Sequence, residues 1–176
     1  MALESRDGED TLDQAIMVSC DLAAIRSGIV GKVREKVKMR LPDFDLHKLF
    51  LNGTHTHTAP VMLEGRYTLP DEGVMKPGEY AQWMTDRVAE AIVEAWQKRA
   101  PGTVAWGQDH AVVGRNRRAG YADGTAKMYG STNTSSFREI EGYEDHDLDV
   151  LFFWDGEDRL IATAINVPCP AQEVGG

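Results

Sequence analysis

The stretch LFLNGTHTH, residues 49–57, places two histidines directly after an apolar run. The apolar residues 49–51 predict a strand. In an extended backbone, residues two apart point to the same face, so we expect His55 and His57 to lie on one face. Neutral imidazole is a common zinc ligand, and two imidazoles on one face can bind a metal ion or a substrate anion. The alternative is two surface histidines on a polar loop; the position after a strand favours a site.

Two strand-then-helix units surround this stretch. The apolar run 15–18 predicts a strand buried on both faces. Apolar residues at a spacing of four then predict a helix that Asp21 caps and Pro42 ends; they are Ile25, Ile29, Val33 and Val37. After residues 49–51, we expect a loop over 65–78 and a helix over about 79–99. The apolar face predicted for this second helix comprises Tyr80, Trp83, Met84, Val88, Ala91, Ile92, Ala95 and Trp96.

The second half of the chain is richer in strand patterns. Residues 104–106 and 111–113 are short apolar runs, and residues 150–154 and 160–165 predict a β-hairpin. Between them, residues 115–147 show no clear period and predict a long loop. The order of elements predicts one α/β domain over residues 1–176, with a mixed β-sheet and flanking helices.

Polar residues fall where the predicted parallel strands end. Asp21 follows the first strand, and the histidine pair follows the second. Ligands of α/β proteins gather at the carboxyl ends of parallel strands. The loop that carries Asn116 and Arg117 could reach the same edge, so we expect a binding site there.

Composition excludes several classes of protein. Of 176 residues, 19 are Lys or Arg and 28 are Asp or Glu, giving a net charge of −9, which argues against nucleic-acid and anionic-membrane binding. No apolar run approaches the roughly 20 residues of a membrane span, and the N-terminus has no secretory signal pattern. We therefore expect a soluble protein. Two cysteines make no disulfide framework and leave the compartment undecided.

Four segments, in order, resemble the neutral/alkaline ceramidase family. Residues 54–60, THTHTAP, resemble its Thr-His-Thr-His-Ser-Gly-Pro signature, and residues 16–22, 114–118 and 149–166 resemble an early strand, an Asn-Arg segment and a late hairpin. The match is specific at the histidines and loose elsewhere. The resemblance implies part of the N-terminal region of a zinc-dependent catalytic domain that hydrolyses the amide bond of an N-acyl sphingosine or a similar lipid-like substrate.

The resemblance also implies roles for individual residues. His55 would be a metal ligand, His57 would contact the substrate or the developing oxyanion, and Arg117, beside the substrate-binding Asn116, would hold a polar substrate group. Bound zinc would polarise the amide carbonyl and lower the pKa of bound water to about 7. The alternatives are a solvent-facing or supporting role for His57 and a surface role for Arg117. His47, His110 and His146 match no motif.

The chain departs from the family pattern near its end. The family's second metal histidine aligns best with Cys169, whose thiolate could bind zinc or whose thiol could be packed; Gln172 and Glu173 are further polar candidates. The family's opening strand, serine nucleophile and later metal ligands have no counterpart here.

We therefore expect either a fragment of a larger catalytic domain, truncated at both ends, or a natural short version of it. Such a chain could pair with the missing remainder or form a homo-oligomer. The alternative function is a non-catalytic domain that keeps the fold and binds a ligand or a partner.

Overall fold

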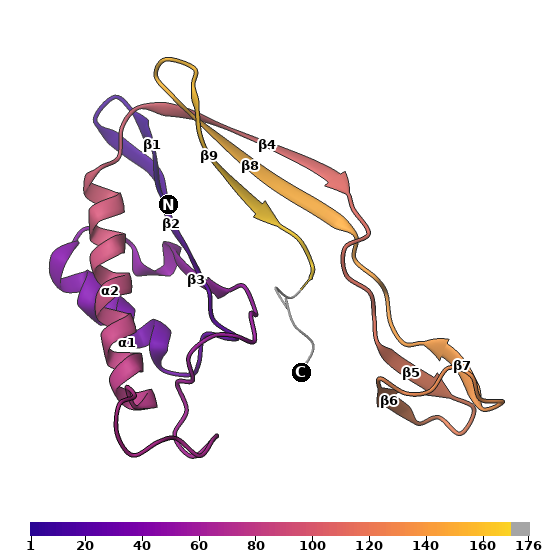
Figure 1. The fold of residues 1–176 in the computed structure, drawn as a ribbon. Helices are drawn as coiled ribbons and strands as arrows, with labels where there is room; N and C mark the ends of the chain where they lie inside the picture. The colour runs from indigo at the N-terminus through magenta and orange to yellow at the C-terminus, as the bar shows by residue number, and fades with distance from the viewer. Residues whose placement is uncertain (170–176) are drawn as a thin grey trace. The chain divides into compact units, whose positions relative to one another are not determined.

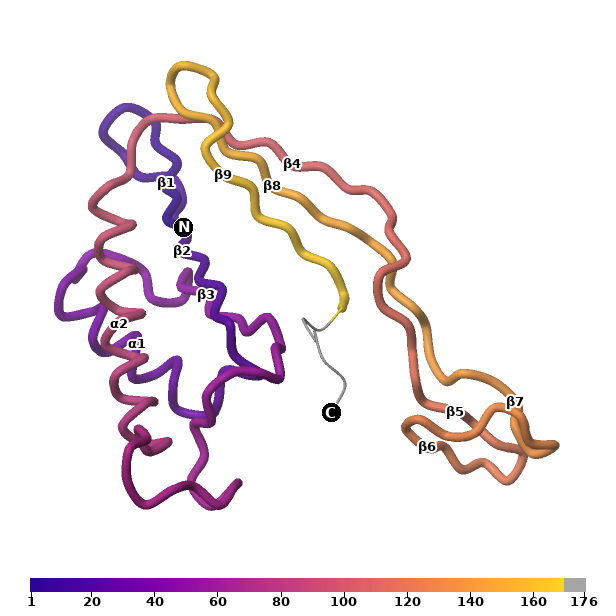
Figure 2. The backbone as a smooth tube through the Cα atoms, viewed as in Figure 1, coloured from indigo at the N-terminus to yellow at the C-terminus, as the bar shows by residue number. Residues whose placement is uncertain are grey.

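The computed structural model describes residues 1–169, which divide into two compact units. The described residues of the first unit are Met1–Ala100, and those of the second are 101–169. Both units are visible in the ribbon of Figure 1, and the course of the backbone can be followed in Figure 2. The prediction that the two units form a single domain stays a prediction.

The first unit contains a mixed three-stranded sheet, as the sequence predicts. Its strands are β1 (Ala2–Asp7), β2 (Asp10–Cys20) and β3 (Leu49–Gly53), in the order β1-β2-β3. β1 and β2 form an antiparallel hairpin, whereas β2 and β3 are parallel, with Ile16 opposite Leu49. β2 is longer than predicted, because it extends into polar residues that pair with β1. Such polar strand ends carry no hydrophobic signal in the sequence.

One face of this sheet is covered by two helices. They are α1 (Ile29–Arg40) and α2 (Pro77–Gln97). Ile16 and Leu49 project from the sheet into a core that also contains Val33 and Ile92, all four at most 2% exposed. The other face carries Met17 and Phe50, which are 37% and 53% exposed. The prediction that residues 15–18 are buried on both faces is therefore wrong in the described chain.

The start of α1 differs from the prediction. The helix begins at Ile29, after Gly28 with φ +83°, and no side chain caps it. Asp21 is not its cap, because residues 21–28 form an irregular connection between β2 and the helix. The predicted apolar stripe is confirmed at Ile29, Val33 and Val37, and the helix ends before Pro42.

Helix α2 begins and ends two residues before its predicted bounds, and it turns a slightly different face to the core. Its start is fixed by Pro77 and by the carboxylate of Glu79, which accepts a hydrogen bond from the Lys76 backbone at 3.0 Å. The predicted Met84 and Ile92 are buried, but Trp83 is 49% exposed. Thr85 takes a buried position; its hydroxyl donates to the carbonyl of Gln82 at 2.8 Å, so the polar group is satisfied. Ala89 and Val93, which the sequence did not single out, complete the buried face.

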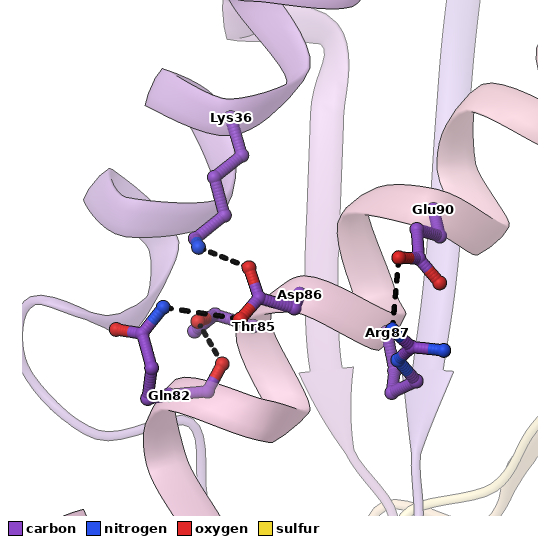
Figure 3. A network of polar contacts seen from close by, with 6 residues as sticks. All are labelled: Lys36, Gln82, Thr85, Asp86, Arg87 and Glu90. Atoms are coloured by element: carbon purple, nitrogen blue, oxygen red, sulfur yellow. Dashed lines mark hydrogen bonds and ion pairs between the residues drawn. The ribbon is translucent and has the colours of Figure 1, made fainter. Parts of the chain in front are cut away.

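A polar network joins α1 to α2 (Figure 3). Lys36 of α1 forms an ion pair with Asp86 of α2, and Gln82 donates a second hydrogen bond to Asp86 at 3.1 Å. Along α2, Arg87 pairs with Glu90 at 2.9 Å. The Lys36–Asp86 pair joins the two helices, whereas Gln82 holds the Asp86 carboxylate from within α2. The Arg87–Glu90 pair, also within α2, adds only a few tenths of a kcal/mol, roughly 0.2–0.5.

The second unit contains a longer antiparallel sheet and a small one. The longer sheet has the order β4-β8-β9, with β4 (Gly102–His110), β8 (Asp147–Asp155) and β9 (Leu160–Asn166). The predicted hairpin is β8-β9 and is confirmed. The predicted strand pattern at residues 111–113 is not a strand; β4 instead continues to His110, opposite Asp147.

About a third of the predicted loop over 115–147 is also sheet. It contains β5 (Arg118–Tyr121), β6 (Ala126–Met128) and β7 (Phe137–Ile140), in the order β6-β5-β7. These strands have only three or four residues, too few to show a period of two. The turn between β5 and β6 contains Gly124 at φ +80°, a conformation that glycine adopts without steric cost.

Buried apolar side chains are distributed unevenly. Ala119 and Phe153 are the buried apolar residues that the structure describes in the second unit, and all the other described ones lie in the first. Among the described residues, neither helix has the length and apolar character needed to cross a lipid bilayer.

Candidate functional site

The carboxyl ends of β2 and β3 meet in the first unit. The parallel register carries Cys20 opposite Gly53. Past that pair, the Thr54 amide donates to the Cys20 carbonyl, and the His55 amide donates to the Leu22 carbonyl, both at 3.0 Å. The predicted adjacency of Asp21 and the histidine motif is present as well: the Thr54 hydroxyl donates to Oδ1 of Asp21 at 3.2 Å.

Gly53 makes this close approach possible. A Cβ atom at this position would lie 2.8 Å from the carbonyl oxygen of Leu22, which is backbone just after β2 and cannot move aside without disturbing its hydrogen bond from the His55 amide. The close backbone approach therefore requires glycine.

The two histidines lie together, although not for the predicted reason. The strand ends at Gly53, and His55 has the left-handed conformation, with φ +62°. An extended backbone is therefore not what brings the side chains together. The turn does so instead: the ring centroids of His55 and His57 are 5.0 Å apart, with the rings inclined at 61°. Both side chains are exposed, so a ligand can reach them.

An apolar cluster lies beneath the strand ends. Leu22, Ile29, Ala81 and Met84 are its buried members, and half-buried Cys20, Ala59, Met62 and Tyr80 pack against them. Burial, and to a smaller extent the charge of Asp21, raises the pKa of the Cys20 thiol. Burial also raises the pKa of Tyr80. At neutral pH the Cys20 thiol and the Tyr80 hydroxyl therefore carry no charge. The carboxylic acid side chain next to the histidine motif is that of Asp21.

The described residues do not by themselves make a complete zinc site. Structural and catalytic zinc ions take at least three ligands from the protein. Within residues 1–169, no group of three His, Cys, Asp or Glu side chains is placed to hold a metal ion. His55 and His57 supply two imidazoles of suitable chemistry, and further ligands would have to be added to them.

Asn116 lies in the second unit and fixes a turn. Its side-chain amide donates to the carbonyl of Tyr143 at 2.9 Å and of Glu141 at 3.3 Å, and its backbone amide donates to Glu144 Oε1 at 2.9 Å. Gly142, between these carbonyls, has φ +92°. Asn116 therefore has a clear structural task, which the sequence did not indicate.

Arg117 contacts an aromatic residue. Its Nη1 donates to the Tyr129 hydroxyl at 2.7 Å, and its guanidinium carbon lies 5.0 Å from the centroid of that ring. Tyr129 is 68% exposed and has φ +54°. Sequence analysis missed Tyr129; the signal would have been an aromatic residue near an arginine in a segment rich in turn residues.

Cys169 packs beside the segment that precedes Asn116. A Cβ atom on Gly114 would lie 2.8 Å from the Pro168 carbonyl oxygen and 3.4 Å from the Cβ of Cys169, so these two irregular segments are in close contact. Cys169 is half-buried. The candidates Gln172 and Glu173 lie outside the described residues.

The predicted site residues therefore form two groups. Asp21, His55 and His57 belong to the first unit, and Asn116, Arg117 and Cys169 belong to the second. In the first group, the bond from Thr54 places Asp21 beside the histidine motif, and in the second, Cys169 lies beside Gly114, two residues before Asn116.

Comparisons with known proteins identify the fold. No family model matches the sequence, and no curated protein matches it. Two solved structures do match: the neutral ceramidase from Pseudomonas aeruginosa, with 22% identity and a TM-score of 0.61, and a ceramidase complexed with C2, with 23% identity and a TM-score of 0.60. Each match covers 90% of this chain.

The chain thus has a mixed α/β fold that is similar to part of a neutral ceramidase. It spans 24% of the length of each of the two ceramidase chains that it matches. The resemblance noted in the histidine motif is confirmed at the level of the fold, as a partial and distant match. At this identity, the likeness establishes the fold alone.

Proposed function

We propose that this chain is part of a zinc-dependent amidohydrolase of the neutral ceramidase type, which cleaves an N-acyl, lipid-like amide bond. The observation that carries the proposal is the histidine pair: two exposed imidazoles 5.0 Å apart, at the joined ends of parallel strands. The ceramidase-like fold and the THTHTAP motif support the same assignment.

The proposed roles follow the chemistry of each side chain. His55 is a zinc ligand, and His57 contacts the substrate carbonyl or the oxyanion that develops on it. Arg117 holds a polar substrate group through its guanidinium, which forms strong hydrogen bonds with anionic oxygen atoms. Asn116, which also orders the adjacent turn, binds the substrate beside Arg117, and Cys169 is a candidate second ligand. Zinc, when bound, would polarise the scissile carbonyl.

Zinc content tests the central assignment. Elemental analysis of protein purified without chelator should find zinc, and His55→Ala should lower the zinc content sharply. His47→Ala is the matched control, because His47 is an exposed histidine of the same unit outside the motif. Equal zinc in the parent protein and His55→Ala would contradict the assignment. A folded, zinc-free parent protein would favour the non-catalytic ligand-binding alternative.

Alkylation tests the proposed role of Cys169. A zinc-bound thiolate resists alkylation until a chelator removes the metal, because coordination occupies the sulfur lone pair. The Cys20→Ser variant isolates the signal of Cys169. If the alkylation rate of Cys169 does not change with chelator, its role is packing, and the second ligand lies elsewhere.

A further inference from the structure

Three hydrogen bonds connect the segment after β3 to the segment after β2. Two are backbone bonds, from Thr54 to Cys20 and from His55 to Leu22, and the third joins the Thr54 hydroxyl to Asp21 Oδ1. All three bonds are made by Thr54 or His55, the last residue before the histidine pair and its first member. The segment is therefore held against β2 at its base, whereas the two imidazoles beyond it are exposed.

These bonds account for the unusual backbone of His55. A residue with a Cβ atom avoids the left-handed region, and it stays there only where surrounding contacts hold it. The His55 amide is held by Leu22, and the preceding residue is held by Cys20 and Asp21. With φ at +62°, the chain turns sharply, and the ring of His57 meets the ring of His55.

We propose that Thr54 and Asp21 are positioning residues that set the relative orientation of His55 and His57. The proposal rests on the proposed function for what the pair binds, but the geometry of the pair can be tested separately. Without the Thr54–Asp21 bond, His55 relaxes toward an extended backbone, and the two rings separate.

The first test measures the ring contact directly. In the folded chain, NMR should show a nuclear Overhauser effect between the ring protons of His55 and His57. Thr54→Val keeps the shape of the side chain but removes the hydroxyl donor, so the effect should be lost. Thr54→Ser restores the hydroxyl and should restore the effect. Asp21→Ala, which removes the acceptor from the other side, should reproduce the result of Thr54→Val.

The control is Thr11→Val. Thr11 also donates its hydroxyl to a carboxylate across the sheet, to Glu4 Oε1 at 2.8 Å, but it lies in the β1-β2 hairpin. This variant should leave the ring contact unchanged, which separates a positioning effect from a general loss of sheet stability. A ring contact that persists in both Thr54→Val and Asp21→Ala would overturn the proposal.

Zinc affinity distinguishes this proposal from the proposed function. Removing a group that orients a metal ligand weakens metal binding about 10- to 100-fold. We expect a weakening of that order in Thr54→Val, with recovery in Thr54→Ser. If the parent protein binds no zinc, the proposed function fails, and the ring contact alone decides whether Thr54 and Asp21 position the pair. If Thr54→Val loses the ring contact but binds zinc as tightly as the parent protein, the orientation of the pair does not matter for zinc binding.

Discussion

In the first unit, two helices cover one face of a mixed sheet; in the second unit, two antiparallel sheets have few buried side chains. Ile16, Val33 and Ile92 in the first unit are at most 2% exposed. In the second unit, Trp106 on β4 is 80% exposed and Ile165 on β9 is 62% exposed. Hydrophobic burial is the main favourable term in folding, so the first unit has its own source of stability.

The difference bears on the candidate site. The histidine pair follows a strand that is anchored in a packed core, so its geometry depends on backbone hydrogen bonds at the end of a well-supported sheet. Asn116 and Arg117 lie in an irregular segment directly before β5, and polar contacts hold them near the surface. Mutations that probe packing should therefore affect the first unit far more than the second.

The largest expected effect comes from a matched pair of isoleucine truncations. Ile92→Ala in the middle of α2 should destabilise the first unit by about 2–5 kcal/mol, because it leaves a cavity in the core. Ile165→Ala on β9 should cost less than about 1 kcal/mol, because its side chain is already exposed. Urea unfolding, followed by circular dichroism, measures both. If both variants lose the same unfolding free energy, the side chain of Ile165 must be covered in solution, and the proposed difference between the two units would be wrong.

A smaller effect is expected where β1 meets α2. Arg99 lies over the Trp96 ring, 3.4 Å from its centroid, and its Nη2 donates to Glu4 Oε2 at 2.7 Å. Arg99→Ala should therefore destabilise the first unit by about 1–2 kcal/mol. The exposed Arg159, which pairs with Asp155 in the β8-β9 turn of the second unit, is the matched control, and Arg159→Ala should have a smaller effect.

The same contact predicts a dependence of stability on pH. The hydrogen bonds from Arg99 and Thr11 hold the pKa of Glu4 below its ordinary value of 4.5. As the pH falls, the unfolded chain is the first to bind this proton, so the stabilisation is present above the unfolded pKa and is lost through the folded pKa. The unfolding free energy of the parent protein should therefore decrease below about pH 5 more steeply than that of Glu4→Gln. Parallel curves would show that Glu4 is not held as a carboxylate.

The smallest expected effect concerns a single thiol beside the histidine motif. Because burial, and then the charge of Asp21, raises the pKa of Cys20, its alkylation should be slow at neutral pH, and its rate should keep rising with pH beyond the point where that of an ordinary thiol levels off. Asp21→Asn should shift this profile to slightly lower pH, since one repulsive charge is removed. The measurement uses Cys169→Ser, so that one thiol reacts. A profile that is identical in Asp21→Asn would show that the charge of Asp21 does not reach Cys20.

Elements with a long apolar pattern could be predicted from the sequence. The spacing of Ile29, Val33 and Val37 predicted α1, and the continuous apolar runs of β8 and β9 predicted their hairpin. Short strands were not predictable, because three or four residues in β5, β6 and β7 cannot display a period. The polar hairpin partner β1 was missed for the related reason that it has no apolar alternation.

The candidate site shows the same division. The sequence by itself determined that two histidines follow a strand, that an aspartate follows the neighbouring strand, and that the motif resembles a ceramidase signature, because these are local features of the chain. Only the tertiary structure decided that His55 is left-handed, that Thr54 bonds to Asp21, and that the imidazoles meet at 5.0 Å. These facts depend on the parallel register of β2 and β3, which brings together residues more than thirty positions apart, and local sequence patterns do not specify such a register.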